Sequence, residues 1–145
     1  MQFQYRDAID IATSPKRAWA TMVDVEGWPR WTPTVKAAHV LGTRFDIGTQ
    51  VRVEQPRLPA TLWTVTECRQ LEGFSWVASG PGVRSEARHE VRGEGPVSVE
   101  LTLTQAGPMS WLVHLLAGRM TRRYLRQEAE GLKARCEGLP PARGA

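Results

Sequence analysis

The longest hydrophobic pattern in the chain lies near its C-terminal end, over residues 108–137. Pro108 follows Gly107 and suits a first helical turn, because the N–H that proline lacks has no partner there. No further proline occurs before Pro140, and Gly138 is the flexible residue expected just past a helix end. The spacing therefore predicts one helix of about thirty residues, on the order of 45 Å long.

This predicted helix has two apolar sides. One side repeats at three- and four-residue spacing along the whole helix and comprises Trp111, Leu115, Gly118, Arg122, Leu125, Ala129, Leu132 and Cys136. The other side is confined to the first half and comprises Met109, Leu112, Val113, Leu116, Met120 and Tyr124. A helix that is apolar on two sides is covered on both. The core covers one side. A loop, a second subunit or a membrane surface covers the other, or else the helix kinks at Gly118.

Most of the chain before this helix alternates between apolar and polar residues, which predicts strands. The expected strands cover residues 3–11, 35–41, 49–54, 61–68, 74–78, 84–92 and 97–104. Two short helices, over residues 14–23 and 25–31, are expected between the first and second strands. Their tryptophans, Trp19, Trp28 and Trp31, are interpreted as packing residues rather than as ligand contacts. Short turns between the later strands indicate antiparallel neighbours.

The clearest alternation lies in the strand over residues 84–92. One face carries charges of alternating sign, Arg84, Glu86, Arg88, Glu90 and Arg92, and is expected to face solvent. The opposite face, with His89 and Val91, then looks inward, as do Val97, Val99, Leu101 and Leu103 of the next strand. The apolar face needs a partner, and the long helix is the only large one available. We therefore predict an α+β fold in which a curved antiparallel sheet of about seven strands wraps around the C-terminal helix.

The bulk properties narrow the class of protein. A length of 145 residues suits one domain, which we assign to residues 1–138, followed by a disordered tail at 139–145. No apolar run approaches the ~18 residues of a membrane span. The N-terminus lacks the features of a signal peptide, so a cytoplasmic location is expected. Cys68 and Cys136 are far apart in the sequence and are interpreted as free buried thiols.

Several kinds of chemistry find no support in the sequence. The patterns G-x-S-x-G, H-E-x-x-H and GxxxxGK[ST] do not occur. His39, His89 and His114 are too scattered for an obvious metal site, so we expect neither a metal nor a cofactor. The four arginines Arg119, Arg122, Arg123 and Arg126 form a basic ridge, but no motif or exposed aromatic residue accompanies them. Nucleic-acid binding is therefore not expected. A solvated face is the preferred interpretation, with peripheral contact to an anionic membrane as an alternative.

Six short segments follow one another in an order that is informative together. They are residues 12–19 (ATSPKRAW), 28–33 (WPRWTP), 63–66 (WTVT), 73–76 (GFSW), 89–91 (HEV) and 131–137 (GLKARCE). In this order they resemble the START-like (Bet v 1-like, SRPBCC) superfamily, and most of all its bacterial polyketide cyclase/dehydrase-type branch. The resemblance implies a helix-grip fold with an elongated apolar cavity between sheet and long helix. It implies no universal catalytic motif, because this fold hosts lipid carriers, hormone binders, aromatase/cyclases, quinone-binding proteins and chaperone activators.

The candidate site residues come from the inward positions. His89 is the one titratable residue on the inner face of its strand and is either an acid/base group or a core histidine with a backbone or tyrosine partner. Arg122 either pairs with a carboxylate, such as Asp7 or that of a ligand, or extends to solvent. The expected ligand-binding residues are Trp63, Trp76, His89, Val91, Leu101, Leu115, Arg122 and Leu125.

Two functions follow from such a cavity. The first is the binding of a hydrophobic small molecule, such as a lipid, a quinone or a polyketide-like aromatic compound. The second is a cyclase, aromatase or dehydratase that uses His89 for proton transfer. We favour binding, because a catalytic cavity usually shows two or more inward groups that exchange protons. A third hypothesis is a homodimer formed through residues 109–120 of the helix.

Overall fold

The computed structural model describes residues 1–138, which form a seven-stranded antiparallel sheet and three helices. The elements in chain order are β1 (Gln2–Ile11), α1 (Pro15–Val23), η1 (Val25–Arg30), β2 (Ala37–Leu41), β3 (Gln50–Glu54), β4 (Thr61–Arg69), β5 (Gly73–Gly80), β6 (Val83–Arg92), β7 (Val97–Ala106) and α2 (Ser110–Cys136). The α+β helix-grip fold predicted from the sequence is confirmed, including the two short helices between the first two strands. The assignment of residues 1–138 to one domain stays a prediction, and the tail at 139–145 lies outside the described residues.

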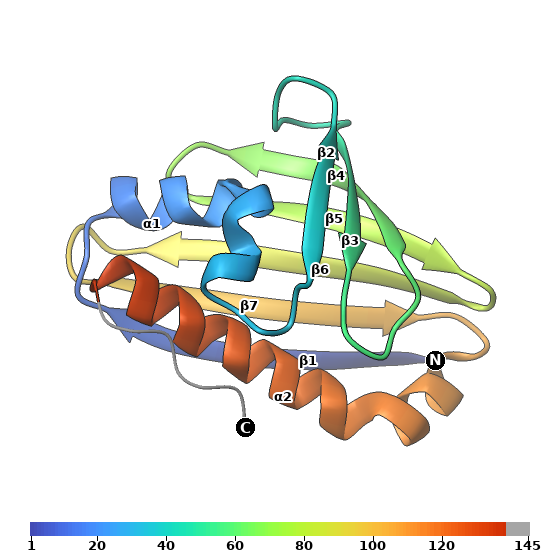
Figure 1. Ribbon diagram of the computed structural model, residues 1–145. Coiled ribbons are helices and arrows are strands. Elements are labelled where there is room, and N and C mark those ends of the chain that lie inside the picture. Colours follow the sequence, from blue (N-terminus) through green and yellow to red (C-terminus); the bar gives the residue numbers. More distant parts are fainter. Residues whose placement is uncertain (139–145) are drawn as a thin grey trace.

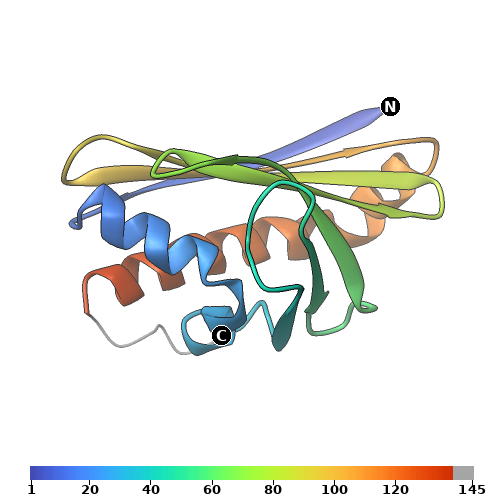
Figure 2. The ribbon, with the colours of Figure 1, turned by 90° about the horizontal axis from the view of Figure 1, so that it is seen from above.

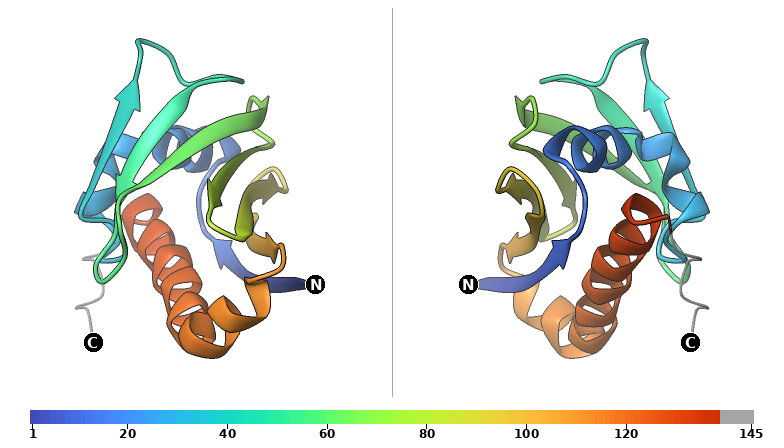
Figure 3. Two further views of the ribbon diagram at one scale, coloured as in Figure 1. Left: turned by 90° about the vertical axis from the view of Figure 1, so that its right-hand side faces the viewer. Right: turned by 90° about the vertical axis from the view of Figure 1, so that its left-hand side faces the viewer.

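The strand order in the sheet is β1-β7-β6-β5-β4-β3-β2. The chain therefore runs as a meander of adjacent hairpins from β2 to β7, and β1 is added at the far edge beside β7. All three helices lie on one face of this sheet, and α2 crosses that face along β1 (Figures 1 and 2). The sheet curls around α2, and β2 and β3 rise steeply from the level of the other strands (Figure 3).

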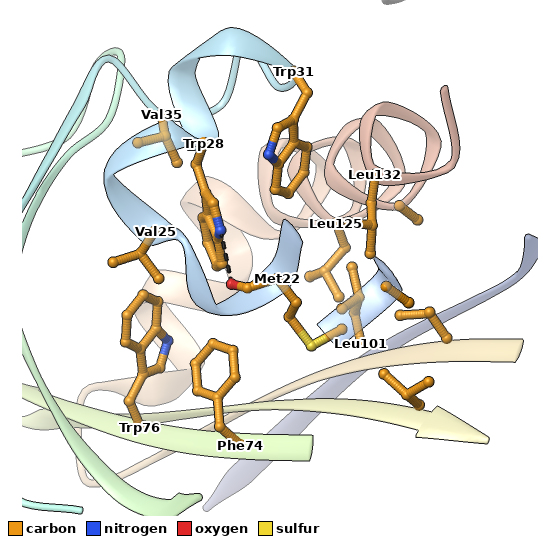
Figure 4. Close-up of a cluster of buried hydrophobic side chains, with 14 of the residues drawn as sticks. Met22, Val25, Trp28, Trp31, Val35, Phe74, Trp76, Leu101, Leu125 and Leu132 are labelled. Atoms are coloured by element: carbon orange, nitrogen blue, oxygen red, sulfur yellow. Dashed lines mark hydrogen bonds between the residues drawn. The ribbon is translucent and has the colours of Figure 1, made fainter. Parts of the chain in front are cut away.

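The first helix begins where the sequence predicts it. The Ser14 side chain accepts a hydrogen bond from the Arg17 backbone N–H at 3.2 Å, and Pro15 occupies the first helical position. Helix η1 follows almost at once and delivers Trp28 to the core, where the indole N–H donates to the Met22 carbonyl at 3.0 Å. Figure 4 shows this bond and the ring of Trp28 facing the sheet residues Phe74 and Trp76.

The C-terminal end of α2 is tied to the end of β1 and to α1. The Glu137 carboxylate accepts hydrogen bonds from the Ala12 backbone N–H at 2.8 Å and from Lys133 Nζ at 2.7 Å. These two bonds, the one from Lys133 first, lower the pKa of Glu137 below its usual range. Arg17 Nε donates to the Cys136 carbonyl at 2.7 Å, which satisfies one of the free carbonyls at the helix end.

The prediction that one stripe of α2 faces the core along its whole length is wrong for the first half. Leu125, Ala129 and Leu132 are buried as expected, but Trp111 is 46 % exposed and Leu115 is 71 % exposed. The stripe repeats every seven residues, and a straight α-helix drifts by ~20° per heptad relative to such a repeat. Three heptads separate Cys136 from Leu115, so a side that faces the core at the end of α2 turns away from it by roughly 60° near the beginning.

Candidate functional site

A cavity of about 170 Å³ lies between the inner face of the sheet and helix α2. The sheet contributes Trp63 from β4, Trp76 from β5, His89 from β6, and Leu101 and Leu103 from β7. Helix α2 lines it with Val113, Ala117, Met120, Tyr124, Leu125 and Glu128, and η1 adds Trp28. The wall provided by α2 therefore belongs largely to the second apolar side of the helix, the one confined to its first half.

Three tryptophan rings line the cavity. The rings of Trp63 and Trp76 stack with centroids 5.5 Å apart, and Trp28 meets Trp76 at the same distance, 5.5 Å, with a tilt of 55°. Trp28 was interpreted from the sequence as a packing residue only. It is buried, but one side of its ring also faces the cavity, because η1 places it between the core and the open space.

His89 is the most buried titratable group at the cavity. Its side chain is 5 % exposed, and its ring stacks on Phe74 with centroids 4.2 Å apart. His89 Nε2 lies 3.3 Å from Glu128 Oε1, while Nδ1 is buried and has no hydrogen-bond partner among residues 1–138. The ring is thus held by an aromatic neighbour on its face and a carboxylate at one nitrogen, while the other nitrogen is buried without a partner among residues 1–138.

Glu128 is the site residue that sequence reasoning missed. Its side chain is 18 % exposed and lines the cavity from α2, opposite His89. The sequence placed it in the solvated region that follows the basic ridge. The available signal was its spacing, three residues after Leu125 and four before Leu132, which puts it at the margin of the buried side. A histidine and a carboxylate within 3.3 Å can share and transfer a proton.

A second polar group faces the cavity from β7. Gln105 continues the inward series of Leu101 and Leu103, and its Nε2 donates to Ser85 Oγ at 3.4 Å. Its Oε1 atom is buried and has no hydrogen-bond partner in the described part of the chain. Arg88 Nε, His89 Nδ1 and this amide oxygen are the three buried side-chain atoms without a hydrogen-bond partner in the described part of the chain, and all three residues line the cavity.

Of the eight residues expected to bind a ligand, five line this cavity: Trp63, Trp76, His89, Leu101 and Leu125. Val91 is also buried, but it lies two residues beyond His89 on β6, opposite Val99 of β7. It does not line the cavity. Leu115 projects into solvent for the reason given above. Whether the five cavity residues bind a ligand stays a prediction.

Arg122 also lies outside the cavity. Its guanidinium carbon is 5.5 Å from the centroid of the Tyr5 ring, and the residue is exposed, in agreement with the interpretation that it extends to solvent. Asp7, which was considered as its partner, pairs instead with Arg126 at 3.0 Å. Arg126 lies four residues further along α2, one turn closer to Asp7.

Tyr5 and His114 form a contact between β1 and α2 on the other side of the helix. The Tyr5 hydroxyl hydrogen-bonds His114 Nδ1, and the His114 ring stacks on Phe3 with centroids 4.1 Å apart. Burial raises the pKa of Tyr5, and the positive charge of Arg122 partly opposes this rise. None of these residues lines the cavity, so the contact positions α2 rather than taking part in binding.

Among residues 1–138, no three or more His, Cys, Asp or Glu side chains come together in a group that could hold a metal ion. Within the same residues, no helix is both long and apolar enough to cross a membrane.

The comparisons with known proteins agree with one another. The sequence matches the family model described as "Polyketide cyclase / dehydrase and lipid transport" over residues 2–137. No curated protein matches the sequence. Among solved structures, Ara h 8.0201 is similar with a TM-score of 0.70 at 11 % identity, over 94 % of this chain and 98 % of that one.

Two di-domain ARO/CYC proteins are also similar in structure. BexL, from the BE-7585A biosynthetic pathway, has a TM-score of 0.73 at 13 % identity, and the match covers 99 % of this chain and 51 % of BexL. StfQ, from the steffimycin biosynthetic pathway, has a TM-score of 0.72 at 14 % identity, with 97 % of this chain and 51 % of StfQ covered. The chain therefore spans about half the length of these two proteins.

Proposed function

The chain belongs to the polyketide cyclase/dehydrase and lipid transport family, and from this premise we propose that it binds a hydrophobic small molecule in the cavity between the sheet and α2. The observation that carries the proposal is the cavity itself, whose walls are mostly apolar and include three tryptophan rings. Such walls favour a lipid chain, a quinone or a polyketide-like aromatic compound.

The volume limits how much of a ligand lies inside. A cavity of about 150 Å³ holds one benzene ring, and sites for larger ligands measure about 300–1,000 Å³. The 170 Å³ found here therefore fits one aromatic ring or a short alkyl segment. A larger ligand would therefore extend beyond this cavity.

Native mass spectrometry of the purified protein, followed by denaturing extraction of anything bound, tests this proposal first. We expect a co-purified lipid, quinone or aromatic acid, or binding of such compounds that quenches tryptophan fluorescence. Ala117→Phe fills the cavity from α2 and should weaken binding by tenfold or more, whereas Leu115→Phe, on the exposed side of the same helix, should leave binding unchanged. An empty protein that binds none of these classes, or equal affinity in both variants, would overturn it.

A second function, proton-transfer catalysis, is favoured by the contact between His89 and Glu128. The preference for binding rested on finding a single inward proton-exchanging group, and Glu128 supplies a second one 3.3 Å away. In a cyclase, aromatase or dehydratase, His89 would take or give the proton while Glu128 stabilises the charge that forms on the ring.

The substitutions His89→Gln and Glu128→Gln separate the two functions. If the protein is a catalyst, turnover of a polyketide-like substrate falls by ~10²-fold or more in His89→Gln, while ligand affinity changes much less. If the protein is a carrier, no turnover is detectable in any form, and the retained affinity of His89→Gln supports binding alone. Arg84→Gln, exposed on the same strand and outside the cavity lining, serves as the control.

Association with other surfaces remains a separate proposal. Met109, just before α2, and Trp111, Leu115 and Leu116 in its first half are all at least 40 % exposed, and a homodimer contact or a peripheral membrane contact would cover them. A homodimer would be split by Leu112→Asp in size-exclusion chromatography with light scattering. A monomer at all concentrations would contradict the dimer. The cytoplasmic location stays a prediction from the N-terminal sequence.

A further inference from the structure

A second hollow, which we call the arginine groove, lies next to the cavity. It encloses about 360 Å³ and is lined by Arg57 from the β3–β4 loop and by Arg119 and Arg123 from α2. Met120 and Tyr124 line both the groove and the cavity, so these two side chains form the boundary between them. One ligand could therefore occupy both spaces.

The charges in the groove are all of one sign. Its lining includes three arginines and no aspartate or glutamate. Arg119 and Arg123 are four residues apart on α2, a spacing at which like charges repel. Among residues 1–138, neither Arg57 nor Arg119 forms an ion pair, in contrast to Arg126, which pairs with Asp7 and Glu130. An anion in the groove would balance the charges of Arg57 and Arg119 and bind to their guanidinium groups.

The β3–β4 loop is held in place beside α2, as the close approach of the two in Figure 1 suggests. The Tyr124 hydroxyl donates a hydrogen bond to the Pro56 carbonyl at 2.7 Å, next to Arg57 in the chain. Arg57 itself has a φ of 65°, a left-handed conformation that is uncommon for residues other than glycine. The strained backbone and the tyrosine bond together place the Arg57 side chain over the same groove as the two arginines of the helix.

From this arrangement we infer that the ligand is amphipathic and carries an anionic oxygen group, a carboxylate or a phosphate. The apolar part enters the cavity, and the anionic group remains outside in the groove, bound by Arg57, Arg119 and Arg123. The inference rests on the proposed binding function and specifies its ligand class. It also agrees with the small inner volume, because the part of a ligand that does not fit inside the cavity would lie in the neighbouring groove, which shares Met120 and Tyr124 with it.

A matched pair of ligands tests the inference. Octyl phosphate and octanol have the same chain and differ only in the anionic group, so isothermal titration calorimetry of both isolates its contribution. We expect octyl phosphate to bind at least tenfold more tightly than octanol at low ionic strength, with the difference reduced in high salt. Arg119→Gln and Arg57→Gln should each reduce this preference by about threefold or more and leave octanol binding unchanged.

Control variants and other anion sources decide between the outcomes. Arg84→Gln removes the same charge from the exposed outer face of β6 and should keep the full preference. Equal affinity for the two ligands, or the same loss in Arg84→Gln as in Arg119→Gln, would overturn the inference while leaving the proposed function intact. If neither octyl compound binds, the inference fails; the proposed function fails with it only if the lipids, quinones and aromatic acids also do not bind.

Two further measurements distinguish the anionic group of a single ligand from free phosphate and from a membrane surface. If inorganic phosphate binds in an Arg119-dependent way but does not compete with octyl phosphate, the groove is a separate phosphate site and the inference is wrong. If vesicles of phosphatidylglycerol bind in an Arg119-dependent way while octyl phosphate does not, the groove recognises a membrane surface and the single-ligand inference is wrong. Competition by phosphate together with tight binding of octyl phosphate would support it.

Discussion

The close approach of α2 to the segment after η1 leads to a pair of opposite predictions for two glycines of the same helix. A Cβ atom at Gly131 would lie 2.0 Å from the Trp31 carbonyl oxygen and 3.1 Å from its carbon. A Cβ atom at Gly118 would lie 3.3 Å from the Tyr5 hydroxyl oxygen and 3.4 Å from His114 Nδ1. The first neighbour is backbone, while the other two are ends of side chains, so only the second site can adjust easily.

The magnitudes follow from two opposing effects. Alanine is favoured over glycine in a helix by ~1 kcal/mol. At residue 131 the backbone must move by on the order of 1 Å, and overpacking of this kind costs about 1–3 kcal/mol. A clash with backbone lies at the upper end of that range, so Gly131→Ala should reduce the free energy of unfolding by about 2 kcal/mol. Gly118→Ala needs a shift of only tenths of an ångström and should be neutral or stabilise by up to ~1 kcal/mol.

Urea unfolding followed by circular dichroism measures both variants. A loss of about 2 kcal/mol lowers the urea midpoint with an unchanged m-value, and in a thermal melt it corresponds, for a chain of this length, to a fall in Tm of roughly 4–8 °C. The result also concerns the cavity, because Trp31 directly follows the helix that places Trp28 in its wall. If Gly131→Ala is as stable as Gly118→Ala, then α2 and the Trp31 backbone do not approach as closely as described, and the reasoning is refuted.

Three further predictions concern stability. Leu132→Ala should lower the free energy of unfolding by about 2–5 kcal/mol, because Leu132 is 1 % exposed. Leu115→Ala, at a position that is 71 % exposed, should lower it by less than about 0.5 kcal/mol in the same urea assay. Equal losses would contradict the assigned faces of α2. Because the pKa of Tyr5 is raised in the fold, the unfolded chain loses this proton first as pH rises above about 10, so Tm should fall there, and less steeply in Tyr5→Phe. Because the pKa of Glu137 is lowered, its contribution should be present at neutral pH and be lost on acidification below about 4.5, so Tm values of wild type and Glu137→Gln should converge in acid; a constant difference would refute this.

Most of the architecture could be predicted because each strand shows its own alternation of apolar and polar residues. The alternation in residues 84–92 placed His89 and Val91 inward, and both are buried. The order and approximate bounds of the helices also followed from local signals, such as the capping of α1 by Ser14. These features depend on residues near one another in sequence, which is where pattern reasoning is strongest.

The candidate site was harder to predict because it depends on contacts between layers. The alternation of residues in β6 fixed the face of the sheet on which His89 lies. The rotation of α2 about its own axis decides that Glu128 contacts His89. That rotation is set by contacts distant in sequence, such as Tyr5 with His114 and Asp7 with Arg126. The sequence pattern extended a heptad stripe through Arg122 and Leu115, and these two positions turned out to face solvent.

The drift of the helix explains the cavity as well as the misplaced residues. In its second half, α2 turns Leu125, Ala129 and Leu132 into the core. In its first half the side toward β1 is occupied by His114 and Gly118. The apolar side with Val113, Ala117 and Met120 then faces the open space under the sheet, and Leu115 and Leu116 face outward. Substitutions of Val113, Ala117 or Met120 should therefore change ligand affinity. Substitutions of Leu115 or Leu116 should change only association with other surfaces.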